Sequence, residues 1–120
     1  MSIMNSNEFA DDKSVAAIDK VLTITTSATV TTYQMTVTDQ VVLVTTVSSY
    51  ALALTLPSVR LAKGRIYSIR LVTDGGEDIT LDDFGTDDAA FSALTFGDAT
   101  DHALLYSDGY KWITIYSTGV

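Results

Sequence analysis

At 120 residues the chain has room for one domain, which would bury roughly two-thirds of its unfolded surface. No apolar run approaches the roughly 20 residues that span a bilayer, and cysteine is absent, so we expect no membrane span, disulfide or thiolate metal site. The net charge of −8 argues against nucleic-acid binding, because an acidic surface repels phosphate.

The first 20 residues differ from the rest. Asn5, Asp11 and Asp12 make the opening polar, and residues 14–20 have the composition of one or two helical turns, too few to be stable alone. The opening lacks the basic and apolar regions of a secretory signal, so we expect synthesis and folding in a cytoplasm. We interpret residues 1–20 as an N-terminal arm, either mobile or ordered by docking, and residues 21–120 as a β domain.

From residue 21 onward, short runs of β-branched and apolar residues with a period of two predict one strand after another. The expected strands are residues 21–25, 29–37, 41–45, 51–56, 65–73, 77–81, 103–107 and 110–116. Asp74-Gly75-Gly76 and Asp108-Gly109 predict hairpin turns, because glycine accepts the positive φ that tight turns need.

The alternation within these strands predicts the core. Tyr33 and Met35 are expected to share one face of their strand. The expected inward residues are Leu52, Leu54, Leu56, Tyr67, Ile69 and Leu71. Residues 41–45 are apolar on both faces, which predicts a central strand. Many short strands separated by turns predict an all-β class, with a single antiparallel β-sandwich or a short jelly-roll-like barrel.

The charged residues are unevenly distributed. Four cations, at positions 60, 63, 65 and 70, form a basic stretch, and ten acids with no lysine or arginine follow from Asp74 to Asp108. One interpretation is a solvated acidic rim with a basic edge. The other is pairing between subunits, in which the basic stretch of one copy meets the acidic loop of the next.

The chain holds no enzyme signature. His102 is the only histidine, so it lacks the partners of a catalytic triad. The four aspartates of residues 82–88 could offer oxygens to calcium, but their spacing does not match a calcium-binding loop, and a solvated loop is the favoured interpretation. We expect no enzymatic activity, no metal and no cofactor.

The aromatic residues allow two interpretations. They are Tyr33, Tyr50, Tyr67, Tyr106, Tyr110, Trp112 and Tyr116. They could form a platform on which sugar rings stack, but in an all-β chain such residues more often pack across strands or at interfaces.

An ordered set of short motifs covers about residues 33–116. The motifs are Asp-Gln-Val-Val-Leu-Val at 39–44, Ala-Leu-Thr-Leu-Pro at 53–57, Gly-Arg-Ile-Tyr-Ser-Ile-Arg at 64–70, Ile-Thr-Leu at 79–81 and Leu-Tyr-Ser-Asp-Gly-Tyr-Lys-Trp at 105–112. This set resembles a small β module of phage virion proteins, found in head fibres, capsid decoration proteins and tail-appendage tips. The resemblance implies a homotrimer.

The resemblance and the small size together favour a non-enzymatic capsid decoration protein, which binds the major capsid protein on the surface of the virion. An alternative is a tail-fibre or head-fibre appendage that binds host-surface glycan, and a cellular or secreted β domain is a third interpretation. The residues expected to contact the capsid or a neighbouring subunit are Arg60, Lys63, Arg65 and Arg70 of the basic stretch and Phe9, Val15 and Ile18 of the arm.

Overall fold

The computed structural model describes residues 18–85 and 87–120. Most of the expected arm, including Phe9 and Val15 and most of its predicted helical turns, therefore lies outside the described residues. Every regular element in the described ranges is a strand, which confirms the all-β class. None of these residues belongs to a helix long and apolar enough to cross a membrane.

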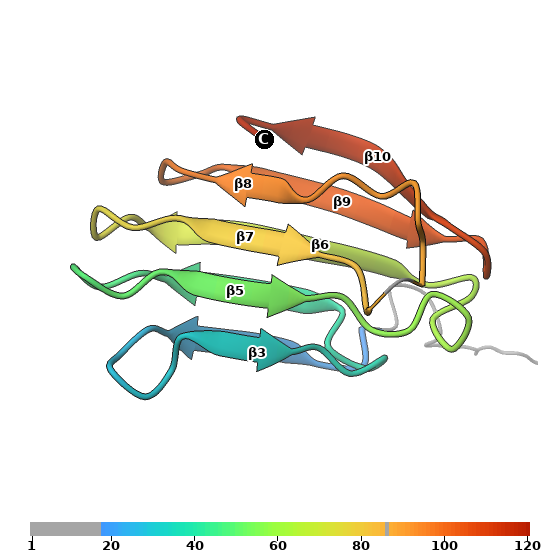
Figure 1. Ribbon diagram of the computed structural model, residues 1–120, viewed down its shortest axis with the longest axis horizontal. Helices are drawn as coiled ribbons and strands as arrows, with labels where there is room; N and C mark the ends of the chain where they lie inside the picture. The colour runs from blue at the N-terminus through green and yellow to red at the C-terminus, as the bar shows by residue number, and fades with distance from the viewer. Residues whose placement is uncertain (1–17, 86) are drawn as a thin grey trace, which may run out of the picture.

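The described strands form two sheets (Figure 1). The strands are β2 (Val21–Thr25), β3 (Thr32–Gln34), β4 (Val41–Thr45), β5 (Leu52–Thr55), β6 (Ile66–Thr73), β7 (Ile79–Asp82), β8 (Leu94–Phe96), β9 (His102–Ser107) and β10 (Trp112–Thr118). The five-stranded sheet has the order β10-β9-β6-β4-β2, and the four-stranded sheet has the order β3-β5-β7-β8.

From β2 to β7 the chain alternates between the two sheets. Each strand pairs in parallel with the strand one full circuit later: β2 with β4, β4 with β6, β3 with β5, and β5 with β7. This is the winding of a β-solenoid, in which each coil contributes one strand to each sheet. The first coil holds β2 and β3, the second β4 and β5, and the third β6 and β7.

The first two coils repeat each other in sequence. Val21 pairs with Val41, and the order Val-Leu-Thr-Ile-Thr-Thr at 21–26 corresponds to Val-Val-Leu-Val-Thr-Thr at 41–46. Each of these coils also closes the same small turn, with a bridge between Ser27 and Val30 in one and between Val47 and Tyr50 in the other. The third coil starts further along the chain than this repeat would place it, because the segment between β5 and β6 is longer than the segment between β3 and β4.

The expectation of an antiparallel topology is wrong for most of the structure, since four of the seven pairings among the described strands are parallel. The sheets also do not close into a barrel. Asp74-Gly75-Gly76 is not a hairpin turn: it carries the chain from β6 in one sheet to β7 in the other. The second expected hairpin is confirmed, because β9 and β10 pair antiparallel around Asp108-Gly109.

The core lies between the two sheets. Residues at the same position of successive coils stack on one another, as Ile24, Val44 and Leu71 do in the five-stranded sheet. All the expected inward residues are buried. Met35 and Tyr33, which were expected to share a face, both turn to the core, Met35 buried and Tyr33 half-buried. Burial raises the pKa of the Tyr67 hydroxyl to about 12, and that hydroxyl donates a hydrogen bond to the Val37 carbonyl (2.7 Å).

Two buried threonines hold successive coils together where the chain leaves the five-stranded sheet. Thr26 Oγ1 accepts a hydrogen bond from the Val47 amide (2.8 Å). Thr46, at the same place in the next coil, accepts one from the Gly75 amide (3.0 Å) and donates one to the Glu77 carbonyl (3.0 Å). Each hydroxyl therefore satisfies backbone groups that water cannot reach.

Asp39 is a fully buried carboxylate at the end of the first coil. It accepts hydrogen bonds from the Tyr33 hydroxyl (2.8 Å) and the Thr36 amide (2.9 Å), and Lys20 Nζ lies 3.2 Å from its other oxygen. Burial acts to raise the pKa of Asp39, but these hydrogen bonds outweigh it and hold the pKa below its ordinary value. Burial, together with the neighbouring carboxylate, raises the pKa of Tyr33 to about 12.

Asp39→Asn should lower the free energy of unfolding at pH 7 by about 2 kcal/mol, the usual loss for a hydrogen bond to a charged group. Because the folded pKa is depressed, the stabilisation is present above the unfolded pKa of about 3.9 and is lost as the pH falls through the folded value. Urea unfolding over a pH series measures this, with the exposed Asp98→Asn as control. A difference that stayed constant into strong acid would mean that the charge of Asp39 is not what stabilises the fold.

Candidate interaction surface

The outer faces of the two sheets differ in polarity. In the four-stranded sheet, Thr32, Ala53, Thr80 and Thr95 form one outward row across all four strands. Alongside Thr23, Ser68, Arg70 and His102, the outer face of the five-stranded sheet carries many apolar side chains. We call this set the apolar face; it consists of Val21, Val41, Leu43, Ile66, Leu104, Tyr106, Ile113 and Tyr116.

The strand register joins these side chains into one surface, because directly opposed residues point to the same side of a sheet. One row across the sheet runs Val21, Val41, Ser68, Leu104, Tyr116. A second row runs Ile66, Tyr106, Ile113. Val21 is 57% exposed, Ile66 46% and Tyr116 59%. Contiguous apolar surface of this kind is unusual on a monomer and marks a site of interaction.

A groove with a volume of about 430 Å³ lies on this face. It is lined by Ile18, Gln40, Val41, Gly64, Arg65, Ile66, Ser68 and Leu104. Four of these side chains are aliphatic, while Gln40, Arg65 and Ser68 add polar groups. The groove suits an apolar side chain of a partner, flanked by groups able to form hydrogen bonds.

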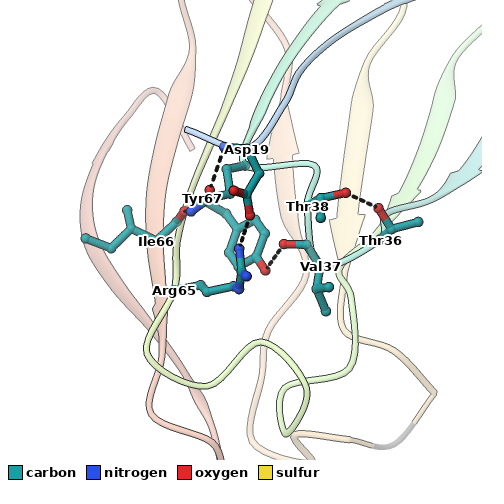
Figure 2. Close-up of polar contacts among 8 residues, drawn as sticks. Asp19, Thr36, Val37, Thr38, Arg65, Ile66 and Tyr67 are labelled. Atoms are coloured by element: carbon teal, nitrogen blue, oxygen red, sulfur yellow. Dashed lines mark hydrogen bonds and ion pairs between the residues drawn. The ribbon is translucent and has the colours of Figure 1, made fainter. Parts of the chain in front are cut away.

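The residues before β2 are held beside this groove. The Arg65 guanidinium pairs with the Asp19 carboxylate at 2.5 Å, an ion pair that raises the pKa of Arg65. The Asp19 amide donates a hydrogen bond to Gln40 Oε1 (3.1 Å). Figure 2 shows Asp19 beside Arg65, with the Tyr67 hydroxyl directed at Val37 behind them. These contacts fix Ile18 as one wall of the groove.

The structure brings together two of the residues expected from the sequence to make contacts, Ile18 and Arg65. The other cations of the basic stretch do not line the groove. Arg70 lies on the outer face of β6, opposite Leu43 and His102 in the register. Arg60 and Lys63 are exposed in the connection between β5 and β6.

Sequence reasoning missed most of the apolar face. One signal was present: residues 41–45 are apolar on both sides, and this was assigned to a central strand. The register confirms the central position, since β4 lies between β2 and β6. However, the outward residues Val41 and Leu43 remain half-exposed. The same two-sided pattern in β10, where Ile113 follows the buried Trp112, could have indicated a second apolar surface.

The acidic loop is organised by its own carboxylates. Asp88 is buried and accepts hydrogen bonds from the Trp112 amide (2.8 Å) and the Ala90 amide (3.1 Å). Asp83 accepts one from the Asp88 amide (2.9 Å), and Asp87 accepts one from the Val59 amide. In the described ranges no three acidic or histidine side chains gather where they could hold a metal ion. These aspartates bind backbone amides and tie the loop to β10 and to the end of the second coil.

The aromatic residues divide between the core and the surface. Trp112 is 7% exposed, and its ring meets that of Tyr67 edge to face at a centroid distance of 5.5 Å. Tyr106 and Tyr116 belong to the apolar face, and the His102 ring lies 5.6 Å from Tyr116. Tyr110 is exposed at the tip of the last hairpin. Trp112 is therefore a core residue and is not available to stack on a sugar.

Comparison with protein-family models, with curated proteins and with solved structures finds no match to this chain.

Proposed function

We propose that this chain is a non-enzymatic structural protein of a phage particle: a capsid decoration protein that stands as a homotrimer on the shell. The observation that supports this most directly is the apolar face, because such a surface needs a partner. The ordered motif set of residues 39–112 supports the assignment to virions. We expect the protein to be made in the host cytoplasm and to reside on the capsid surface.

In this proposal the apolar face packs against the neighbouring subunits of the trimer. Completing the burial of a half-exposed valine or isoleucine contributes about 1 kcal/mol. The exposed members of the face, Val21, Ile66, Ile113 and Tyr116, would together contribute several such increments. Association costs about 4–15 kcal/mol, so a single pairwise contact is weak. A closed ring is favoured because each subunit then buries two contacts.

In this proposal, the connection between β5 and β6 contacts the capsid shell. It exposes Arg60 and Lys63 on either side of Leu61, whose side chain is 75% exposed. An apolar residue flanked by two cations suits an acidic seam between subunits of the major capsid protein. Each such contact is small, so attachment would depend on many trimers binding to a repetitive surface.

The direct test is the light-scattering mass of the purified full-length protein, alone and mixed with undecorated phage capsids, followed by co-sedimentation. A stable trimer that pellets with the capsids supports the proposal. A protein that stays monomeric and remains in the supernatant would overturn it, and glycan arrays would then test the appendage alternative.

Ile66→Lys should abolish the trimer while leaving the domain folded, because Ile66 is already 46% exposed and points away from the core. The matched control is Thr80→Lys, which adds the same charge to the polar outer face of β7. Sedimentation velocity measures the mass of both variants. An Ile66→Lys protein that kept the mass of the wild type would exclude the apolar face as the subunit contact.

A further inference from the structure

Both sheets end on the same coil. β2 is the last strand of the five-stranded sheet, and β3 is the last strand of the four-stranded sheet. In Figure 1 they lie at one end of the stack, β3 in front and β2 behind it. At the opposite end, the antiparallel strands β8, β9 and β10 follow the third coil. Among the described residues no strand pairs with the outer edge of β2 or of β3, so the first coil presents two strand edges side by side.

The hydrogen-bonding direction of each edge follows from its neighbours. The Thr26 amide donates to the Thr45 carbonyl, and the Val41 amide donates to the Lys20 carbonyl, so the even-numbered residues of this segment face β4. Backbone direction alternates along a strand, so the amides and carbonyls of Val21, Thr23 and Thr25 point away from β4. Next to β3, the Ala53 amide donates to the Thr31 carbonyl. The backbone amides and carbonyls of Thr32 and Gln34 therefore point away from β5.

Within the two described edge strands, none of the usual protection against strand pairing is present. Natural edge strands are blocked by charged side chains, proline or bulges. β2 reads Val-Leu-Thr-Ile-Thr and β3 reads Thr-Tyr-Gln, without a charge or a proline, and both pair with their inner neighbours in an unbroken register. By contrast, β10 at the other edge of the five-stranded sheet carries an irregularity between Thr114 and Tyr116.

The inner side of the first coil is also incompletely covered. Leu22 and Tyr33 face the core but remain half-exposed. Their partners in the second coil, Val42 and Leu54, are 0% and 1% exposed, because a coil lies on each side of them. A further layer on the first coil would bury Leu22 and Tyr33 in the same way.

We propose that two copies of this chain pair through their first coils. β2 of one copy lies antiparallel to β2 of the other, β3 lies antiparallel to β3, and a two-fold axis runs perpendicular to the sheets. A suitable partner must offer two uncharged strand edges at the spacing of the two sheets, and the chain itself offers them on this coil. The pairing uses both first-coil edges of each copy, and a two-fold contact of this kind closes as a dimer. It requires no contact through the apolar face.

The test is amide hydrogen exchange, followed by NMR on the full-length protein at increasing concentration, with sedimentation velocity in parallel. The outward amides of Thr23, Thr25, Thr32 and Gln34 should become protected as the mass doubles. Protection at these amides that does not change with concentration would overturn the proposal, as would a mass that never doubles.

Thr32→Lys supplies the matched variant. Thr32 and Thr80 lie in the same outward row of the four-stranded sheet, but only Thr32 is on the edge strand. Thr32→Lys should weaken the doubling of mass at least ten-fold, because it places a charged side chain on the edge strand of each copy, and edge charges oppose strand pairing. Thr80→Lys should leave it unchanged. Thr23→Pro is a second variant that should also weaken the doubling of mass, because it removes an outward amide of β2 that β4 does not use.

The same series separates this pairing from the trimer of the proposed function. If both contacts form, the wild type gives pairs of trimers, Thr32→Lys gives trimers, and Ile66→Lys gives dimers. A trimer that never doubles would overturn only the edge pairing. A dimer that Ile66→Lys does not affect would support the edge pairing and exclude the trimer.

Discussion

Replacing Gly75 with alanine should lower the free energy of unfolding by at least about 3 kcal/mol, at the upper end of the usual cost of overpacking. A Cβ at this position would lie 2.2 Å from the Thr46 carbonyl oxygen and 2.9 Å from the Val47 Cα. These are backbone atoms of the second coil, and Thr46 is also hydrogen-bonded to the Gly75 amide. The coil cannot move away without losing that contact.

The neighbouring Gly76 provides the control for this prediction. It has a φ of +97° but nothing lies within 4 Å of its Cβ position. Gly76→Ala should therefore cost only the about 1–2 kcal/mol of a left-handed backbone conformation. Urea unfolding of the two variants compares close packing with backbone strain. Equal losses would show that the approach of the third coil to the second at Gly75 is not tight.

Trp112→Ala should destabilise the domain by about 3–5 kcal/mol, the range for removing a buried tryptophan from a core. Its ring packs edge to face against Tyr67, where it is 7% exposed. Chemical denaturation measures the loss, and the near-ultraviolet circular dichroism of the aromatic core should weaken with it.

Tyr110→Ala is the comparison for Trp112→Ala, because Tyr110 lies two residues earlier and is 80% exposed. Its free energy of unfolding should stay within about 0.5 kcal/mol of the wild type, as is usual for surface substitutions. A Trp112→Ala protein as stable as Tyr110→Ala would contradict the core position of the tryptophan.

Sequence alternation predicted the strands and their inward faces because both are local properties. Leu52, Leu54 and Tyr67 alternate with polar or small residues, and one buried face is enough to produce that pattern. The turn at Asp108-Gly109 was also predictable, since its geometry depends on the glycine and its immediate neighbours. Asp74-Gly75-Gly76 has the same composition, but its role depends on Thr46, far away in the sequence, so it was wrongly predicted to be a hairpin.

Strand order was harder to predict from the sequence, because it depends on which distant strand each strand pairs with. The sequence nevertheless contained a signal, because the pattern of residues 21–26 is repeated at residues 41–46. Both runs end in two threonines, as expected if the two coils have the same length. Thr26 and Thr46 are buried because they bind the next coil.

The candidate surface was predictable only in part. Ile18 and Arg65 do meet at the groove, but Arg65 is paired with Asp19 and Arg70 lies elsewhere on the sheet. The apolar face could not be assembled from the sequence, because its rows join residues of five strands whose order was unknown.

The coil architecture also bears on how the chain folds. The parallel pairings join residues 20 to 28 positions apart, and each coil contacts its immediate neighbours. Since the entropy of closing a loop rises only with the logarithm of its length, closing each new coil costs a similar amount. The second coil is the one with parallel partners on both sides. Folding is therefore expected to begin at the second coil and to spread outward one coil at a time.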